Sequence, residues 1–286
     1  MSVPDRPAGA LLDRAATRGP SPLADLAAPE GGILVIAPHP DDETLGCGLA
    51  IRAALAAGRD VGVLLLTGGG GSHPASRSHP PAAMVALRRR EFAAALDALA
   101  SGLPADAGTL CARTLDEPDG AVPHSPPGSD GAFQAARAFA RDLRAATLWV
   151  TWGGDPHIDH AAAAALADRL VARWGGPPPT RRDYAVWGRF GAAGVRVDTG
   201  DLVAFDAPIH RPAKRAAMAA YRSQLTPMVS DDPNGFVMPP ALVEHFAEAP
   251  ELFVIEPENG TVSAGTAMLP RRGAPTIGTR IRERLA

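Results

Sequence analysis

Residues 32–48 read GILVIAPHPDDETLGCG, and this stretch is the strongest indication of the fold and of a site. Its first half is a continuous apolar run, which is typical of a strand buried on both faces. Its second half places His39 beside three consecutive carboxylates, Asp41, Asp42 and Glu43. Adjacent carboxylates repel one another, and a loop that needed only solubility could use serine, asparagine or glycine. The stretch therefore predicts a buried strand that ends at a site for a positively charged group.

Apolar runs and helical stretches alternate along the rest of the chain. The predicted strands are residues 33–37, 61–67, 109–113, 147–152 and 202–206, and the predicted helices are residues 43–57, 82–101, 131–145 and 160–174. Strands that are apolar on both faces and alternate with helices indicate a parallel sheet. With right-handed crossovers, the pattern predicts an α/β fold, a Rossmann-like doubly wound and mostly parallel sheet with helices on both faces. Ligands of such sheets bind beyond the carboxyl ends of the strands, which is where the polar half of the opening stretch lies.

The chain of 286 residues is 46% hydrophobic, enough for one large core. We expect one catalytic domain over residues 31–257, flanked by weakly ordered extensions at residues 1–30 and 258–286. Two long loops rich in glycine, proline and serine, residues 68–84 and 116–131, follow the second and third predicted strands. Such loops are expected to be mobile and to determine substrate choice at the same edge of the sheet.

The overall charge and the apolar runs exclude several classes of protein. The net charge of −3 gives no electrostatic reason to expect nucleic acid or an acidic membrane surface as a partner. No apolar run approaches the roughly 18 residues of a membrane helix, and the first twenty residues lack the order of a signal peptide. We therefore expect a cytoplasmic protein, and the sequence leaves homo-oligomerisation open. Cys47 and Cys111 lack metal or redox spacing and are expected to be buried free thiols.

A second polar cluster, TWGGDPHIDH at residues 151–160, follows the fourth predicted strand. Parallel strands end at the same edge, so this cluster should reach the first one. His39 and Asp42 are close enough in sequence to hold one ion, and either His157 or His160 could complete a His, Asp, His set with a position open to water. That set is what hydrolytic zinc requires, because the ion lowers the pKa of water to about 7 and polarises a carbonyl. The remaining carboxylate would take the proton, and the remaining histidine would stabilise the oxyanion.

Several other polar residues have simpler interpretations. Asp159 is suited to cap the helix that begins near it. Asp155 is either a turn residue before Pro156 or a substrate contact. His73 and His79, in the first long loop, are expected to be exposed to solvent, with substrate gating as the alternative.

The segments APHPDDE and DPHIDH resemble the two signatures of the PIG-L/LmbE-like de-N-acetylase family. This family includes deacetylases of glucosaminyl-phosphatidylinositol, of mycothiol and bacillithiol precursors, and of glycopeptide antibiotics. Three further segments are similar to the family's R-x-x-E helix, LPDG-type loop and late K…A…H-x-S-Q segment: LRRREFAAAL (87–96), EPDG (117–120) and KRAAMAAYRSQ (214–224). The resemblance spans about residues 31–256.

The resemblance implies one zinc ion and a set of roles for the site residues. The implied zinc ligands are His39, Asp42 and His160. The implied general base is Asp41, and the implied electrophilic histidine at the oxyanion is His157. Further residues fall in segments that border the substrate in this family, namely Arg88 and Asp119.

Two positions need separate comment. Glu43 is expected to act in one of two ways. Its charge would stabilise the N-terminus of the helix, or its side chain would bond to one of the metal ligands without touching the ion. The late family segment usually has a histidine where this chain has Tyr221, and this difference is expected to affect which substrate fits.

The sequence therefore predicts a zinc-dependent hydrolase that removes an N-acyl group, with acetyl as the first expectation, from an amino sugar such as N-acetylglucosamine or its conjugate. An amidase acting on a thiol- or lipid-linked sugar conjugate is the alternative enzyme. An inactive metal-binding protein that recognises a glycan is disfavoured, since it would need neither Asp41 nor His157. A phosphohydrolase would commonly need a second metal about 3.5–4 Å away, and the sequence offers no second ligand set. Iron(II) suits the same ligands as zinc.

Overall fold

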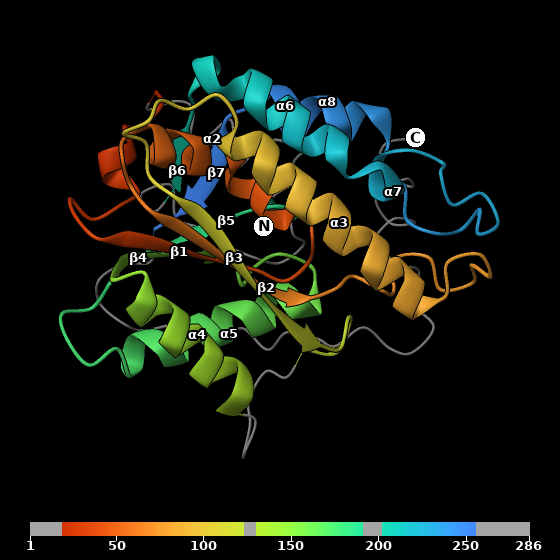
Figure 1. The fold of residues 1–286 in the computed structure, drawn as a ribbon, viewed down its shortest axis with the longest axis horizontal. Coiled ribbons are helices and arrows are strands. Elements are labelled where there is room, and N and C mark those ends of the chain that lie inside the picture. The colour runs from red at the N-terminus through yellow and green to blue at the C-terminus, as the bar shows by residue number, and fades with distance from the viewer. Residues whose placement is uncertain (1–18, 123–129, 191–201, 256–286) are drawn as a thin grey trace, which may run out of the picture.

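The computed structural model describes residues 19–122, 130–190 and 202–255. One sheet runs through it in the order β3-β2-β1-β4-β5-β7-β6 (Figure 1). Its strands are β1 (Gly32–Ala37), β2 (Val61–Thr67), β3 (Leu110–Glu117), β4 (Ala145–Thr151), β5 (Thr180–Tyr184), β6 (Leu202–Phe205) and β7 (Glu251–Val254). Strands β3, β2, β1, β4 and β5 pair in parallel, whereas β7 runs antiparallel to both β5 and β6. The predicted α/β fold with a mostly parallel sheet is confirmed.

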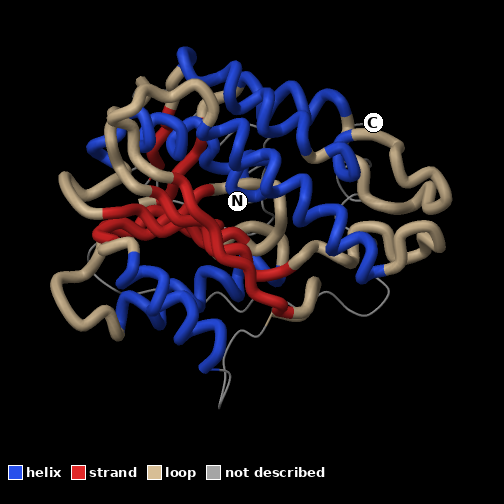
Figure 2. The backbone as a smooth tube through the Cα atoms, viewed as in Figure 1, coloured by secondary structure: helices blue, strands red, loops and turns tan. Residues whose placement is uncertain are grey.

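Helices cover both faces of this sheet, as Figures 1 and 2 show. One face carries α2 (Asp42–Ala56), α3 (Pro81–Ala100), α6 (Arg211–Ala220), α7 (Arg222–Leu225) and α8 (Pro240–Glu248). The other face carries α4 (Asp130–Asp142) and α5 (Ile158–Ala172). Short 3-10 turns η1, η2 and η4 lie at Leu23–Asp25, Gly188–Phe190 and Pro208–His210. The sheet is therefore covered on both sides, as expected of a doubly wound fold.

Strand β1 lies inside the sheet, between β2 and β4, and all six of its residues are buried. Ile33 and Val35 pack into the core under α2 and α3, whereas Leu34 and Ile36 pack into the core under α4 and α5. Successive side chains of a strand point to opposite faces, so burial on both faces requires a run without polar residues. This explains why the opening stretch is continuously apolar instead of alternating.

The junction of β1 and β4 is the topological switch point of the sheet. Helix α2 follows β1 on one face, and helix α5 follows β4 on the other face (Figure 1). In open α/β sheets, ligands bind at such a point, beyond the carboxyl ends of the two strands. The two polar clusters of the sequence follow these two strands, so the topology brings them to one place.

The predicted elements lie within a few residues of the observed ones, but the sequence misses two strands and the helices α6 to α8. Strand β5 reads TRRDY, and this polar sequence lacks the apolar run by which the other strands are predicted. In the structure, Arg181 bonds to Asp183 of the same strand, with Nε to Oδ1 at 2.8 Å, so the two charges satisfy each other. Strand β7 has only four residues, and it lies in the sheet through pairing with β5 and β6.

The segment before β1 joins the core, which differs from the weakly ordered extension that we expected up to residue 30. Leu26 is fully buried, and its carbonyl accepts a hydrogen bond from Trp149 Nε1 at 2.9 Å. The remainder of that extension, residues 1–18, lies outside the described residues, as does the predicted extension at 258–286. We therefore propose that the catalytic domain begins upstream of residue 31.

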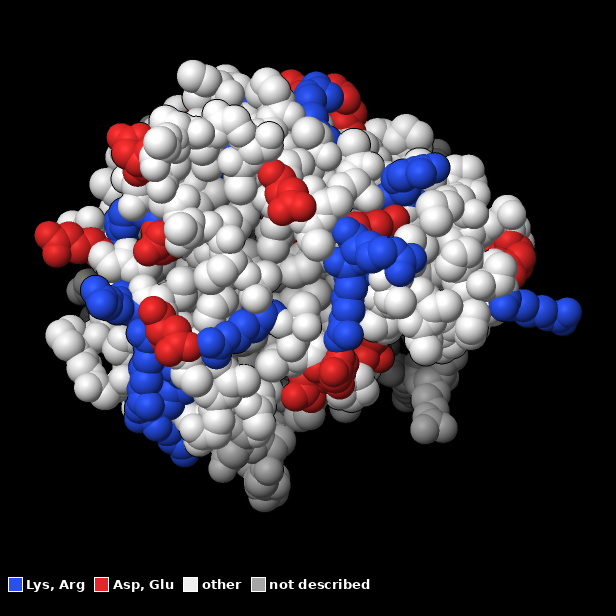
Figure 3. Space-filling model, viewed as in Figure 1, with Lys and Arg blue, Asp and Glu red and all other residues white. Residues whose placement is uncertain are grey.

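The surface and the cysteines fit the composition with one correction. Both cysteines are free thiols, but only Cys47 is buried, because Cys111 lies exposed on the edge strand β3. Charged side chains of both signs are spread over the face shown in Figure 3, in agreement with the small net charge. Across the described ranges, no helix has the length and apolar character needed to cross a membrane.

Helix α2 is interrupted at Cys47, whose φ of −144° and ψ of 22° are not helical. The second half of the helix begins there, and the carboxylate of Glu251 accepts the N–H groups of Leu49 and Ala50 at 2.7 and 2.9 Å. Lys214, the only lysine of the chain, donates to Glu251 at 2.6 Å and to the carbonyl of Leu45 at 3.0 Å. Both charged side chains are completely buried. The pair therefore satisfies the free backbone groups on the two sides of the break.

We expect Lys214→Met to lower the free energy of unfolding by about 3–5 kcal/mol, because it leaves the Glu251 carboxylate buried and uncompensated. Denaturant unfolding measures this loss. The neighbouring Arg215→Met is the matched control, since Arg215 is half-exposed and pairs with Glu244 and Glu248 at the surface. That change should cost at most about 1 kcal/mol. Equal losses for the two variants would contradict a stabilising role of the buried pair.

Candidate active site

The three predicted metal ligands meet at the switch point. His39 lies in the turn after β1, Asp42 is the first residue of α2, and His160 lies in the first turn of α5. The Oδ2 atom of Asp42 is 3.1 Å from Nδ1 of His39 and 3.3 Å from Nε2 of His160. Ligand atoms held about 2.1 Å from a tetrahedral ion lie about 3.4 Å from one another. The separations to Asp42 are therefore close to those that one ion requires.

His160 supplies a direct test of whether a metal fits. Its side chain is completely buried, and within the described part of the chain its Nε2 atom makes no well-aligned hydrogen bond, with only the ion-pair contact to Asp42 Oδ2 at 3.3 Å. Its Nδ1 atom is held by Asp155 Oδ2 at 2.9 Å, which turns Nε2 toward Asp42. Burial lowers the pKa of His160, but the carboxylates of Asp42 and Asp155 outweigh it and raise the pKa to about 9. A buried nitrogen that faces a carboxylate in a site that favours positive charge fits a metal cation, and the donor set suits zinc or iron(II).

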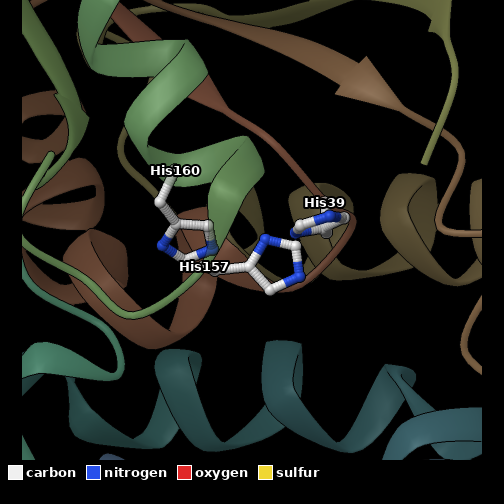
Figure 4. A group of neighbouring side chains, drawn as sticks. All are labelled: His39, His157 and His160. Atoms are coloured by element: carbon white, nitrogen blue, oxygen red, sulfur yellow. The ribbon is translucent and has the colours of Figure 1, made fainter. Parts of the chain in front are cut away.

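His157 completes a cluster of three imidazoles, which Figure 4 shows converging from the turn after β1 and the start of α5. Its ring centroid lies 4.6 Å from that of His39 and 5.1 Å from that of His160. Ligand atoms of these three histidines lie within 4.8 Å of one another, and so do those of a second group formed by His39, Asp119 and Asp159. Over the described ranges, His39 is thus common to both of these groups, and it also belongs to the predicted ligand set.

The tautomer of His157 follows from its role at the start of α5. Its Nδ1 atom accepts the N–H of Asp159 at 3.2 Å and caps the helix, so His157 is the capping residue instead of Asp159. Burial, together with the charges of His39 and His160, lowers the pKa of His157 to about 3. A neutral ring whose Nδ1 accepts a hydrogen bond carries its proton on Nε2. His157 therefore presents an N–H donor on its free side.

Asp159 and Asp119 approach His39 from the side opposite to Asp42. His39 Nε2 lies 3.0 Å from Oδ2 of Asp159 and 3.2 Å from Oδ1 of Asp119. Asp159 is fully buried and also accepts the N–H groups of Gly120 and Val122 at 2.7 and 3.0 Å. It ties residues 118–122 to the site, a role that the sequence does not reveal. The only signal for it is the position of a carboxylate immediately before His160.

Asp41 is the buried carboxylate that the predicted ligand set leaves over. Its Oδ2 atom lies 3.2 Å from Nη2 of Arg88, and its backbone N–H donates to Oε2 of Glu43 at 3.2 Å. Burial raises the pKa of Asp41 to about 7, although the charge of Arg88 opposes the shift. A carboxyl group with a pKa near neutrality can both accept and return a proton.

Arg88 is expected at the substrate, but the structure places it behind Asp41. It is nearly fully buried, and it donates to the carbonyls of Gly69 at 3.0 Å and Pro40 at 2.6 Å. Gly69 has a φ of +65°, and a Cβ atom there would lie 1.9 Å from the guanidinium. Glycine is therefore required for Arg88 to reach both turns and the carboxylate of Asp41.

Two further residues that were expected to influence the substrate have buried side chains. Asp155 has no exposed side-chain surface, and its oxygens accept the N–H groups of Val186, Trp187 and Gly188 in addition to holding His160. Tyr221 is buried too, and its hydroxyl donates to Glu43. Neither side chain has surface to offer a substrate, and Asp155 instead orients His160. Among the residues expected to border the substrate, Asp119 alone keeps some exposure, with 20% of its side chain accessible.

The first long loop is more firmly held than its composition suggests. Asp231 accepts hydrogen bonds from the hydroxyls of Ser76 and Ser78 at 2.8 and 2.9 Å. His73 is buried, contrary to the expected exposure, whereas His79 is only half-buried. Gly71 N–H donates to Asp119 Oδ2 at 2.6 Å, so this loop reaches the edge of the site. Residues 123–129 of the second long loop lie outside the described part of the chain.

The two polar clusters of the sequence thus meet at the switch point of this fold. Residues 34–171, slightly less than half of the chain, match the model of the PIG-L family, described as GlcNAc-PI de-N-acetylase. Among curated proteins, no sequence matches this chain.

Several solved structures share this fold. N,N′-diacetylchitobiose deacetylase from Pyrococcus horikoshii superposes with a TM-score of 0.59 at 19% identity, covering 82% of this chain and 87% of that one. The conserved protein TT1542 from Thermus thermophilus has a TM-score of 0.53 at 25% identity, covering 82% and 98%. The A40926 pseudoaglycone deacetylase Dbv21 has a TM-score of 0.57 at 19% identity, covering 79% and 96%. At these identities, the likeness establishes the fold.

Proposed function

We propose that the chain is a metal-dependent hydrolase that removes an N-acyl group, acetyl in the first instance, from an amino sugar or its conjugate. The observation that carries this proposal is the convergence of His39, Asp42 and His160 on one point beside the buried carboxylate of Asp41. The match of residues 34–171 to the PIG-L family model supports hydrolysis of an amide.

The proposed ligands of the ion are His39 through Nδ1, Asp42 through Oδ2 and His160 through Nε2. Zinc is the first expectation, and iron(II) suits the same donors. When bound, such an ion polarises the amide carbonyl and lowers the pKa of water. Asp155 keeps the imidazole of His160 in the tautomer whose Nε2 carries no proton, by accepting a hydrogen bond from Nδ1–H at 2.9 Å.

Asp41 is proposed as the general base and then the general acid. Arg88 holds its Oδ2 atom, which leaves Oδ1 to take a proton from the attacking water. Asp41 then gives that proton to the nitrogen of the amide as the C–N bond breaks, so the products are a free amine and a carboxylic acid. A pKa near 7 lets one carboxyl group perform both transfers near neutral pH.

His157 is proposed to stabilise the oxyanion that develops on the carbonyl. Its Nδ1 atom accepts the Asp159 N–H, so the donor that the ring can offer to an oxyanion is Nε2–H. A neutral donor that is already fixed in position needs no reorganisation when the negative charge appears. Asp119, which is partly exposed and next to His39, is proposed as the contact to a substrate hydroxyl or amide.

The experiment that tests this function is release of a free amine from a panel of N-acetylated compounds by the full chain, loaded with zinc or with iron(II). The panel contains N-acetylglucosamine, its glycosides, and thiol-linked and lipid-linked conjugates. We expect equal amounts of amine and acetate from the sugar conjugates. Turnover of the thiol- or lipid-linked members alone would favour the alternative amidase. Saturable binding of sugars without turnover by the metal-loaded chain would favour an inactive glycan-binding protein and refute the hydrolase.

A further inference from the structure

The backbone of Asp41 is strained. Its φ of +118° and ψ of −30° lie outside the regions that residues with a Cβ atom normally adopt. Such conformations are unfavourable and persist only where the surroundings hold them. The other non-glycine residue with positive φ in the described ranges is Arg144, which is far along the chain. The turn at Asp41 therefore needs groups that hold it in place.

One such group is Glu43, which lies beneath the turn and is fully buried. Its Oε2 atom accepts the backbone N–H of Asp41 at 3.2 Å. Its Oε1 atom accepts the hydroxyls of Thr44 and Tyr221. A buried carboxylate is stable only when donors surround it. The Tyr221 hydroxyl is therefore part of what keeps Glu43 in position under Asp41.

Tyr221 lies at the junction of α6 and α7, and this junction also fixes the helix that carries Arg88. Two residues further on, the backbone N–H and the hydroxyl of Ser223 donate to the two carboxylate oxygens of Glu91, at 2.8 and 2.6 Å. Glu91 lies on α3, one turn after Arg88, and Arg88 contacts the other side of Asp41. One short segment thus supports both neighbours of Asp41.

We propose that Tyr221 is a positioning residue that holds the strained turn of Asp41 through Glu43. This inference rests on the proposed function of Asp41 as the base. The phenol ring is buried in the core. Of the groups in the described ranges that donate to the Glu43 carboxylate, the Tyr221 hydroxyl is the one that is distant in sequence, the others being Asp41 N–H and the Thr44 hydroxyl. Without that donor, Glu43 can turn away and the strain at Asp41 can relax. The carboxylate of Asp41 then moves away from the substrate amide whose hydrolysis it is proposed to catalyse.

The chain offers a matched pair of variants, because it has only two tyrosines and both are buried with bonded hydroxyls. Tyr221→Phe removes the donor to Glu43. Tyr184→Phe removes a hydroxyl that donates to the carbonyl of Ile36 at 2.8 Å and does not touch Glu43. The two variants lose the same atom and one buried hydrogen bond each. They differ in whether that bond leads to Asp41.

The test combines steady-state kinetics on the best N-acetylated substrate with hydrogen exchange of the Asp41 amide, measured by NMR on the metal-loaded full chain. Misplacing a reacting group by about 1 Å can cost about 100-fold in rate. We expect Tyr221→Phe to lower kcat by about 10–100-fold with KM and metal content unchanged, and to speed exchange of the Asp41 amide while β1 amides stay protected. Tyr184→Phe should change neither kcat nor the Asp41 amide.

Each result decides the proposal. Unchanged exchange at Asp41 in Tyr221→Phe overturns it, and so does faster exchange with an unchanged kcat. A general rise in exchange across β1, or an equal loss of kcat in Tyr184→Phe, shows a role in stability alone and also overturns it. A wild-type chain that hydrolyses nothing refutes the proposed function, but the exchange measurement still shows whether Tyr221 holds the turn, because it needs no substrate.

Discussion

Asp41→Asn is expected to lower kcat by about 10³–10⁴-fold, near the upper end of what a positioned acid–base group contributes. Asparagine has the same shape as aspartate, and its amide oxygen can keep the contact with Arg88. It cannot accept a proton from water or return one to the leaving amine. Steady-state kinetics measures the loss, and metal analysis of the same samples should give equal metal content for variant and wild type.

The control for this change is Asp142→Asn, on the surface at the end of α4, where the carboxylate pairs with Arg113. It should retain wild-type kcat. If Asp41→Asn keeps kcat within about threefold of the wild type, Asp41 is not the base. If Asp41→Asn loses its metal instead, the carboxylate is a ligand, and the proton must be taken by another group at the edge of the site.

The parts of the molecule that the sequence predicts are those that depend on neighbouring residues in the chain. Strand β1 is apolar throughout because both of its faces are buried, so its pattern is readable without knowing its partners. The meeting of His39 with His160 follows from the parallel order of β1 and β4, since parallel strands present their carboxyl ends at one edge. Fold and candidate ligands therefore come from one local pattern and one rule of topology.

The contacts around those ligands depend on segments that are distant in the sequence and pack against the site in the fold. No local sequence pattern specifies where these segments lie. Asp155 looks like a turn residue, but three backbone N–H groups of residues 186–188 and the ring of His160 surround its carboxylate. From the sequence, Tyr221 is expected to affect which substrate fits, but the fold buries its side chain against Glu43. His73 looks like a loop residue in solvent, yet its ring packs against the backbone of Gly235.

Replacing a metal ligand should have the largest effect of all, because it removes the ion and the chemistry that depends on it. We expect Asp42→Ala and His160→Ala to retain little metal and to lose kcat by more than about 10⁴-fold, whereas the wild type should hold about one ion per chain. Asp155→Asn keeps every ligand but weakens the orientation of His160. It should bind metal about 10–100-fold more weakly, as expected when the partner of a ligating histidine is changed.

The same series distinguishes the ligand groups that the geometry allows. His157→Ala should keep its metal and lose kcat by about 10²–10³-fold, since it removes a donor to the oxyanion and no ligand. If His157→Ala instead loses metal while Asp42→Ala keeps it, the ion is held by the three histidines of Figure 4. If Asp119→Ala loses metal while His160→Ala keeps it, the ion lies on the other side of His39, with Asp119 and Asp159 as its ligands. Because His39 belongs to every group, His39→Ala should lose metal in each case, and a His39→Ala variant that still binds the ion would refute a metal centre at the switch point.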